Sequence, residues 1–254
     1  MMALTFAAFV FIATFLAAFA GFQLRRFVPE RLTDEATEGG VKVMIGMLSM
    51  LTTVVLGFVT ADAKSSFDNA AKIVSDTAVR LVAIDRVLAD FGGDEAPAVR
   101  RSIKQAAKVW IDRIHSPAGD TLADFRVVQR GEELEDLFRR IEELEPSSEA
   151  QAADQARAIE HAAGILHDRW ALMTERAAST PTVFLMVVLA WLAMEFFIFG
   201  LFTRPNAMIV AATVIAAVTV ASAIFLVLDL EGPTTGPMRV STRNLERAVA
   251  IMGR

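Results

Sequence analysis

Four long apolar runs divide this chain into two hydrophobic pairs with a polar region between them. Three of the runs contain no charged residue, and the third along the chain contains only Glu195. A helix of about 20 residues, rising 1.5 Å per residue, crosses the roughly 30 Å hydrocarbon core of a bilayer. The pattern therefore predicts four transmembrane helices in two hairpins, at residues 3–24, 43–61, 180–203 and 206–228.

The polar region is also helical by its periodicity. Apolar positions recur every three or four residues after the second run, up to Phe91, and no turn signal interrupts them. One long helix is predicted over 43–91, ended by Gly92 and Gly93. The predicted fold class is an all-α membrane protein, with hairpins at 1–62 and 180–229, a helical bundle at 63–179, and a turn and helix at 230–254. Within the bundle and the tail, helices are expected at 99–114, 132–145, 147–178 and 242–252.

Composition and charge exclude several classes of protein. A net charge of −5 argues against nucleic-acid binding, which needs a basic face, and the absence of Cys excludes a disulfide framework or a thiolate nucleophile. Ala18-Phe19-Ala20 has the form of a signal-peptide cleavage site, but no basic residue precedes it and the apolar run is long, so the first helix is expected to be retained.

The distribution of basic residues predicts the orientation in the membrane. With four spans, both termini and residues 63–179 share one side, and only five of the 25 Lys and Arg residues lie on the other: Arg25, Arg26, Arg31, Lys42 and Arg204. The shared side is predicted to be cytoplasmic, which makes this a multi-pass protein of the cell inner membrane. Arg25 and Arg26, directly after the first span, oppose that orientation.

No catalytic, metal-binding or cofactor-binding motif is present. His161 and His167 are six residues apart and therefore lie on different helix faces, although Glu160 and Asp168 are nearby. The spacing that places two imidazoles of a zinc site on one face is missing, as is a glycine-rich phosphate loop. We therefore predict no enzyme activity, no metal and no cofactor.

The second apolar run carries a stripe of small and polar residues, which we call the polar stripe. Its members fall within about 80° of one another on a helix: Gly46, Ser49, Thr53, Gly57, Thr60 and Lys64. Small residues allow close packing of helices in lipid, and this is one interpretation. The other is a pore wall, in which hydroxyls replace part of an ion's hydration shell. Lys64 favours an anion-attracting pore mouth, and Asp68, one turn further on, opposes that inference.

Phenylalanines also cluster on one side of the first span, opposite Ala17, Ala20 and Gly21. Packing of the small side against a neighbouring helix, with the aromatic side facing lipid, is the simpler interpretation. If phenylalanines from several subunits instead form a hydrophobic constriction, the candidates are Phe11, Phe15 and Phe58.

Two further carboxylates stand out. A Glu within an apolar span is costly unless it has a partner or lines water, so Glu195 is expected to meet polar groups at the same depth: Thr14, the stretch 49–53 and Thr213. Asp229, at the end of the fourth span, faces the unfavourable end of the helix dipole and is expected to have a cationic partner. The candidates are Lys64, Arg176 and Arg239, of which Arg239 is favoured. Solvation of Asp229 by water is the alternative.

Two stretches of the chain resemble the bacterial bestrophin-like family of unknown function. The first holds Leu56-Gly57-Phe58, Phe67-Asp68, Asp76-Thr77-Ala78, Leu81, Ile84-Asp85 and Leu88; the second holds Leu228-Asp229-Leu230, Pro233, Gly236 and Arg239-Val240-Ser241. Members often have a basic pair after the Phe-Asp and a Glu at the place of Asp76, and this chain departs from both patterns with Asn69-Ala70 and Asp76. The resemblance implies an oligomeric ion channel whose second span lines the pore.

Three functions follow from these observations. The first is a homo-oligomeric, anion-conducting channel with the permeant ion, the lipid bilayer and copies of itself as partners. The second is a membrane-embedded signalling or scaffolding protein, with the helical bundle as its docking surface. The third is a proton or cation carrier that depends on Glu195.

Overall fold

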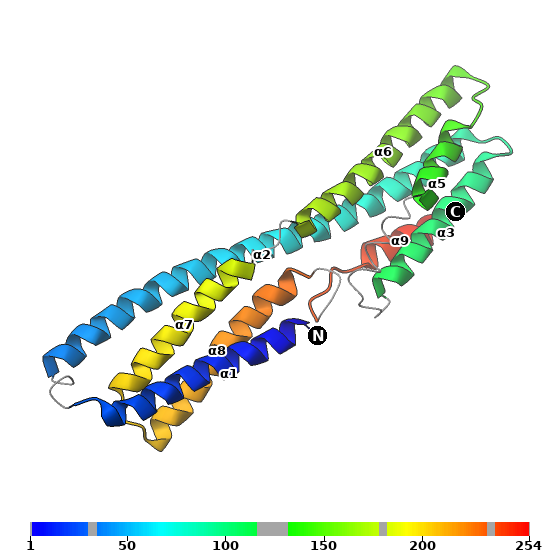
Figure 1. Ribbon diagram of the computed structural model, residues 1–254. Helices are drawn as coiled ribbons and strands as arrows, with labels where there is room; N and C mark the ends of the chain where they lie inside the picture. The colour runs from blue at the N-terminus through cyan, green and yellow to red at the C-terminus, as the bar shows by residue number, and fades with distance from the viewer. Residues whose placement is uncertain (1, 30–34, 116–131, 178–181, 233–236, 254) are drawn as a thin grey trace. The chain divides into compact units, whose positions relative to one another are not determined.

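The computed structural model describes residues 2–29, 35–115, 132–177, 182–232 and 237–253, and within these ranges the chain is helical, with no strand. The chain divides into two compact units (Figure 1). The first unit comprises Met1–Ser66 and Ser179–Gly232, and the second comprises Phe67–Ala178 and Pro233–Arg254. One helix, α2 (Glu35–Phe91), contributes to both units, because its apolar periodicity continues without a break.

The first unit holds the apolar helices. They are α1 (Met2–Leu24), followed by the short 3₁₀ helix η1 (Arg25–Phe27), then α7 (Thr182–Phe202), α8 (Ala207–Leu230) and the first half of α2. Helix α1 lies side by side with α7 and α8 (Figure 1). By length and composition, four helices in the described residues are able to cross a membrane, and the four predicted apolar helices are thereby confirmed.

Glycines set the close approach of α1 and α7. A Cβ at Gly200 would lie 2.2 Å from the carbonyl oxygen of Ala18, and a Cβ at Gly21 would lie 2.2 Å from that of Phe197. Distances below 3.0 Å are sterically forbidden, so only glycine permits these two backbones to meet. The prediction that the small side of the first span packs against another helix is confirmed at Gly21, whereas Ala20 is exposed and Phe22, on the aromatic side, is buried.

Polar side chains form hydrogen bonds with backbone groups at the ends of two apolar helices. The guanidinium Nη1 of Arg25 donates to the carbonyl oxygen of Leu201 at 3.1 Å, which satisfies a carbonyl in the last turn of α7. At the start of α8, the side-chain oxygen of Asn206 accepts from the backbone N–H of Ile209 at 2.8 Å, an N-cap. These contacts stabilise the end of α7 and the start of α8, at the boundary between the two apolar runs.

The second unit is a bundle built around the second half of α2. Helix α2 ends at Gly92 and Gly93, whose φ angles of 67° and 75° are left-handed and stop a helix at low cost. Helix α3 (Ala96–His115) packs against α5 (Glu132–Glu142) and α9 (Arg243–Ile251), and α5 packs against α6 (Glu149–Ala177). The core of this unit includes the fully buried side chains of Ile84, Leu88, Ile103, Ile141, Leu245 and Met252.

A buried ion pair attaches the end of the chain to this bundle. Asp85, 2% exposed, accepts from Nε and Nη2 of Arg100 at 2.9 and 3.0 Å, and from the backbone N–H of Gly253 at 3.0 Å. Gly253 has a left-handed φ of 81°, and Lys104 donates to the carbonyl of the preceding Met252 at 2.5 Å. The three hydrogen bonds to the Asp85 carboxylate thus come from residues 15 and 168 positions away in the sequence.

Acid should weaken this ion pair. Burial alone would raise the pKa of Asp85, but the hydrogen bonds from Arg100 and Gly253 outweigh it and hold the pKa below its usual value. A depressed folded-state pKa means that the carboxylate's contribution to stability is fully present above the unfolded pKa of about 3.9 and is lost as the pH falls through the folded value. Asp85→Asn should therefore lower the free energy of unfolding by about 3 kcal/mol at pH 7, with the gap to wild type narrowing below about pH 4.

Thermal unfolding followed by circular dichroism measures the difference in stability between wild type and Asp85→Asn at each pH. Asp136→Asn is the matched control, because Asp136 pairs with Arg139 on the surface, where both side chains are more than half exposed and the pair contributes little. A gap between wild type and Asp85→Asn that is unchanged from pH 7 to pH 3 would contradict the assignment.

Candidate functional site

Most of the polar stripe lies on a side of α2 that the rest of the described chain leaves uncovered, whereas Ser49 and Thr60 are half-buried. Gly46, Thr53, Gly57 and Lys64 are exposed. Among the described residues, none has an atom within 4 Å of a Cβ added at Gly46 or Gly57. Unlike Gly21 and Gly200, these two glycines do not serve helix packing within the described part of the chain. If the polar stripe serves helix packing at Gly46 and Gly57, the partner must therefore be another molecule.

The hydroxyls of the polar stripe are oriented by their own helix. Thr53 Oγ1 donates to the carbonyl oxygen of Ser49 at 2.7 Å, and Thr60 Oγ1 donates to that of Leu56 at 2.8 Å. A hydroxyl that donates its hydrogen to the preceding turn keeps its lone pairs available. In this arrangement Thr53 and Thr60 present acceptor oxygens, which suit a cation or water.

Ser49 differs from these threonines, because it is bonded to Glu195 on α7. Ser49 Oγ donates to Glu195 Oε2 at 3.0 Å, and Thr52 Oγ1 donates to Glu195 Oε1 at 2.6 Å. Thr52 is 4% exposed and faces the interior of the first unit, whereas Ser49 and Glu195 are half-buried. The intramembrane carboxylate therefore has a hydroxyl donor on each oxygen, as the cost of placing it in an apolar span requires.

The predicted meeting of polar groups from all four spans is only partly correct. Residues 49–53 do meet Glu195, but Thr14 donates to the carbonyl oxygens of Val10 and Phe11 in its own helix, and Thr213 donates to that of Ile209. A threonine in a helix satisfies its hydroxyl locally when no stronger acceptor is within reach. Similar depth in the membrane was therefore not enough to predict which hydroxyls bond to Glu195.

The phenylalanine candidates occupy different surroundings in the single chain. Phe11 and Phe15 are stacked on α1, with ring centroids 6.1 Å apart, and Phe11 packs against a core formed by Val10, Ala221 and Ile224. Phe58, on α2, is 72% exposed. Phe11 thus has a packing role within the chain, while a constriction built by several subunits stays a prediction.

The predicted pair of Asp229 and Arg239 also stays a prediction. Asp229 is 3% exposed at the end of α8, in the first unit, and Arg239 is exposed and belongs to the second unit. Burial of the Asp229 side chain argues against simple solvation of this carboxylate by water.

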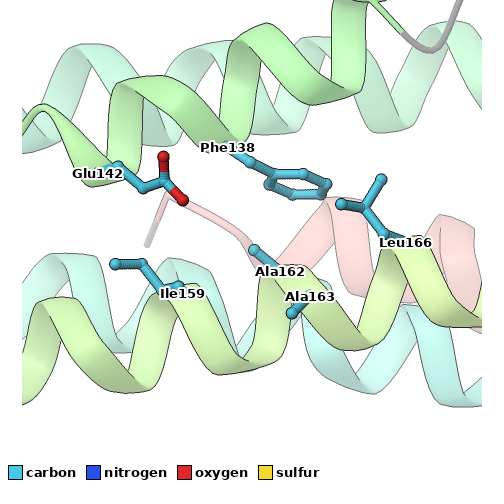
Figure 2. Close-up of a pocket in the computed structure, with 6 residues that line it drawn as sticks. All are labelled: Phe138, Glu142, Ile159, Ala162, Ala163 and Leu166. Carbon is cyan, nitrogen blue, oxygen red and sulfur yellow. The ribbon is translucent and has the colours of Figure 1, made fainter.

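Other candidate sites offer little chemistry. A cavity of about 70 Å³ lies between α5 and α6, and Figure 2 shows its six lining residues, of which only Glu142 is charged. That volume admits a few water molecules but no organic substrate. No group of three potential metal ligands occurs in the described ranges, and Asp168, near the two histidines, is bonded instead to Arg80 at 3.2 Å.

Thr52 lies within the stretch 49–53 that was expected to meet Glu195, but sequence reasoning did not single it out as a hydrogen-bond donor. The residue lies three positions after Ser49 and so shares its side of the helix with Ser49, but it falls outside the polar stripe, which was assembled from spacing alone. The signal that identifies it is the need of a carboxylate for two donors: Ser49 supplies one, and the next hydroxyl within reach is that of Thr52.

Comparisons with known proteins agree with the resemblance found in the sequence. The family model described as a Bestrophin-like domain matches residues 12–245, which confirms that resemblance. No curated protein matches the chain.

Similar solved structures include two crystal structures of a bacterial bestrophin homologue from Klebsiella pneumoniae, each with a single substitution. Both are 16% identical to this chain; their TM-scores are 0.69 and 0.65, and the matches cover 98% and 96% of this chain and 99% and 98% of those chains. A crystal structure of a membrane protein variant matches at a TM-score of 0.68, also at 16% identity, over 98% of this chain and 99% of that chain. At this identity the likeness establishes a shared fold.

Proposed function

Because this chain belongs to the bestrophin-like family, we propose that it is a homo-oligomeric, anion-conducting channel whose pore is lined by α2. Bestrophins are ion channels. The observation that carries the assignment of the pore is the uncovered polar stripe, with open space beside Gly46 and Gly57 in the described part of the chain. Several copies of such a stripe around an axis enclose a conduit, which one chain with four thin helices does not.

The preference for anions rests on Lys64. It is exposed at the end of the polar stripe, and a positive charge at a pore mouth raises the local concentration of anions. The orientation of the Thr53 and Thr60 hydroxyls opposes this preference, because hydroxyls that donate to their own helix are not donors to an anion.

Ion flux from liposomes that contain the purified protein tests the proposal. We expect chloride efflux that is driven by its own gradient and does not require a proton gradient. An alternative function, a proton or cation carrier dependent on Glu195, is favoured by the two hydroxyls that hold this carboxylate inside the first unit. Flux that stops without a proton gradient, and that Glu195→Gln abolishes, would establish the carrier in place of the channel.

Orientation in the membrane is part of the proposal. We place both termini and residues 63–179 in the cytoplasm, as the bias of basic residues predicts. Reporter fusions at Gly93 and at Arg254 should both report a cytoplasmic location, and an external signal at either position would reverse the orientation.

A further inference from the structure

We propose that the first unit binds the headgroup phosphate of an anionic phospholipid at the end where α1 leaves the apolar region. The site, which we call the basic cluster, consists of Arg25, Lys42 and Arg204, together with the carboxylate of Glu38. Binding requires that the apolar helices lie in a bilayer, and it does not depend on ion conduction. It gives a role to Arg25, which opposes the orientation that the other basic residues predict.

Three separate helices bring the basic cluster to one end of the first unit. Arg25 directly follows α1, Lys42 lies in α2 just before the apolar run 43–61, and Arg204 follows α7. Figure 1 shows the end of α1, the start of α2 and the end of α7 at the same end of this unit. Because each cation borders an apolar run, all three lie at the depth of the lipid headgroups when the helices span a bilayer.

The position of Arg25 is fixed by the close approach of α1 and α7. Glycines at positions 21 and 200 bring the two backbones together about one turn before Arg25. There, Nη1 of Arg25 donates to the carbonyl oxygen of Leu201 at 3.1 Å, three residues before Arg204. A guanidinium group has five N–H donors, so this bond leaves others to bind the oxygens of a phosphate.

Glu38 connects the three cations electrostatically. Lys42 Nζ lies 2.8 Å from Glu38 Oε1, one turn away on α2. The hydrogen bond from Lys42 lowers the pKa of Glu38, and the charges of Arg25 and Arg204 lower it further, so both arginines act on this carboxylate. Lys42 and Arg204 are exposed, and Arg25 is half-buried. The basic cluster is therefore reachable from outside the chain.

The balance of charge in the basic cluster favours an anionic headgroup. Its three cations exceed its one carboxylate by two positive charges. An anionic phospholipid offsets this excess with its phosphate, whereas a zwitterionic phospholipid also carries a cation that the basic cluster repels. Basic residues at a membrane surface attract anionic lipids for this reason.

Apolar side chains beside the basic cluster favour a lipid over a free phosphate ion. Leu24 and Phe27, which flank the pair Arg25-Arg26, are 45% and 81% exposed. Exposed apolar residues next to basic ones are typical of a surface that contacts lipid headgroups and the start of the acyl chains. A phospholipid offers a partner to both kinds of side chain, and inorganic phosphate offers one to the cations alone.

Native mass spectrometry of the full-length protein tests this site. The protein in mild detergent is titrated with phosphatidylglycerol, which is anionic, or with phosphatidylcholine, which is zwitterionic, and the fraction with bound lipid is measured. We expect wild type to bind phosphatidylglycerol about tenfold more tightly than phosphatidylcholine. Arg204→Gln should weaken the binding of phosphatidylglycerol about fivefold, as the loss of one basic residue near the membrane surface predicts. Arg25 is left unchanged, because its bond to Leu201 also stabilises α7.

Arg247→Gln is the matched control. Arg247 is also an exposed arginine, but it lies on α9 in the second unit, so its loss should leave the binding of phosphatidylglycerol unchanged. Phe27→Ala retains every charge of the basic cluster and should nevertheless weaken the binding of the lipid. Inorganic phosphate should not displace bound phosphatidylglycerol.

The outcomes are independent of the proposed channel, which the flux from liposomes tests separately. Equal affinity of wild type for the two lipids would overturn the inference, and so would an equal loss of binding in Arg204→Gln and Arg247→Gln. Displacement of phosphatidylglycerol by inorganic phosphate, with Phe27→Ala unaffected, would show a site for small anions in place of a lipid site. Selective binding of phosphatidylglycerol that Arg204→Gln and Phe27→Ala weaken, and that Arg247→Gln does not, is the result that we expect.

Discussion

Replacing Gly57 by leucine should reduce ion flux by about tenfold or more without destabilising the protein. Gly57 is exposed on the polar stripe, and no described residue lies within 4 Å of a Cβ placed there. Leucine is the better helix former by up to about 1 kcal/mol, so α2 itself should not weaken. The added side chain instead fills the space into which the stripe faces, which is the conduit in the proposed assembly.

Two measurements distinguish obstruction of the pore from failed assembly. Efflux of chloride from proteoliposomes gives the flux, and native mass spectrometry in mild detergent gives the number of subunits. Gly39→Leu is the matched control, because Gly39 lies in the same helix, has equally open surroundings among the described residues and is outside the apolar run. Wild-type flux in a correctly assembled Gly57→Leu protein would remove Gly57 from the pore.

The second large effect concerns stability. Gly200→Val should prevent the first unit from folding, because a Cβ at this position would lie 2.2 Å from the carbonyl oxygen of Ala18 and 3.1 Å from the backbone nitrogen of Phe22. Backbone atoms cannot move aside as a flexible side chain does, so α1 and α7 must separate and lose the contact between their surfaces. The expected result is little or no folded protein in membrane extracts, measured as the monodisperse fraction on size-exclusion chromatography.

Gly46→Val is the control for this substitution. It introduces the same side chain into a transmembrane helix, but at a glycine with no described atom within 4 Å. We expect normal yield from Gly46→Val. Equal yields from the two variants would show that α1 and α7 do not meet at Gly200.

Local patterns were sufficient to predict the helices of this protein. The apolar runs and the pair of glycines after Phe91 fix where α1, α2, α7 and α8 lie along the chain, because each depends on residues that are close together in sequence. The structure begins α2 at Glu35, earlier than the apolar run, and includes Gly39 and Gly40. An ion pair between Glu38 and Lys42, 2.8 Å apart and one turn apart, supports the helix there.

Individual contacts between residues far apart in the sequence could not be predicted from these patterns. The bond between the Gly253 N–H and Asp85 joins residues 168 positions apart, and the bonds from Ser49 and Thr52 to Glu195 span 146 and 143 positions. Matching the depths of the apolar helices predicted that residues 49–53 meet Glu195, but it gave no means of choosing which hydroxyls donate to the carboxylate. Gly21 and Gly200 were likewise recognisable as small residues, whereas their close approach depends on how α1 and α7 are placed in three dimensions.

The most direct test of the proposed function is chemical modification of the polar stripe during conduction. The chain contains no Cys, so a single introduced cysteine is the only thiol. Thr53 lies on the polar stripe, and Met47 lies about 120° away around α2; both are exposed in the single chain. A charged, water-soluble thiol reagent should block flux through Thr53→Cys and leave flux through Met47→Cys unchanged. Block of Met47→Cys, with Thr53→Cys insensitive, would contradict the assignment of the polar stripe to the pore.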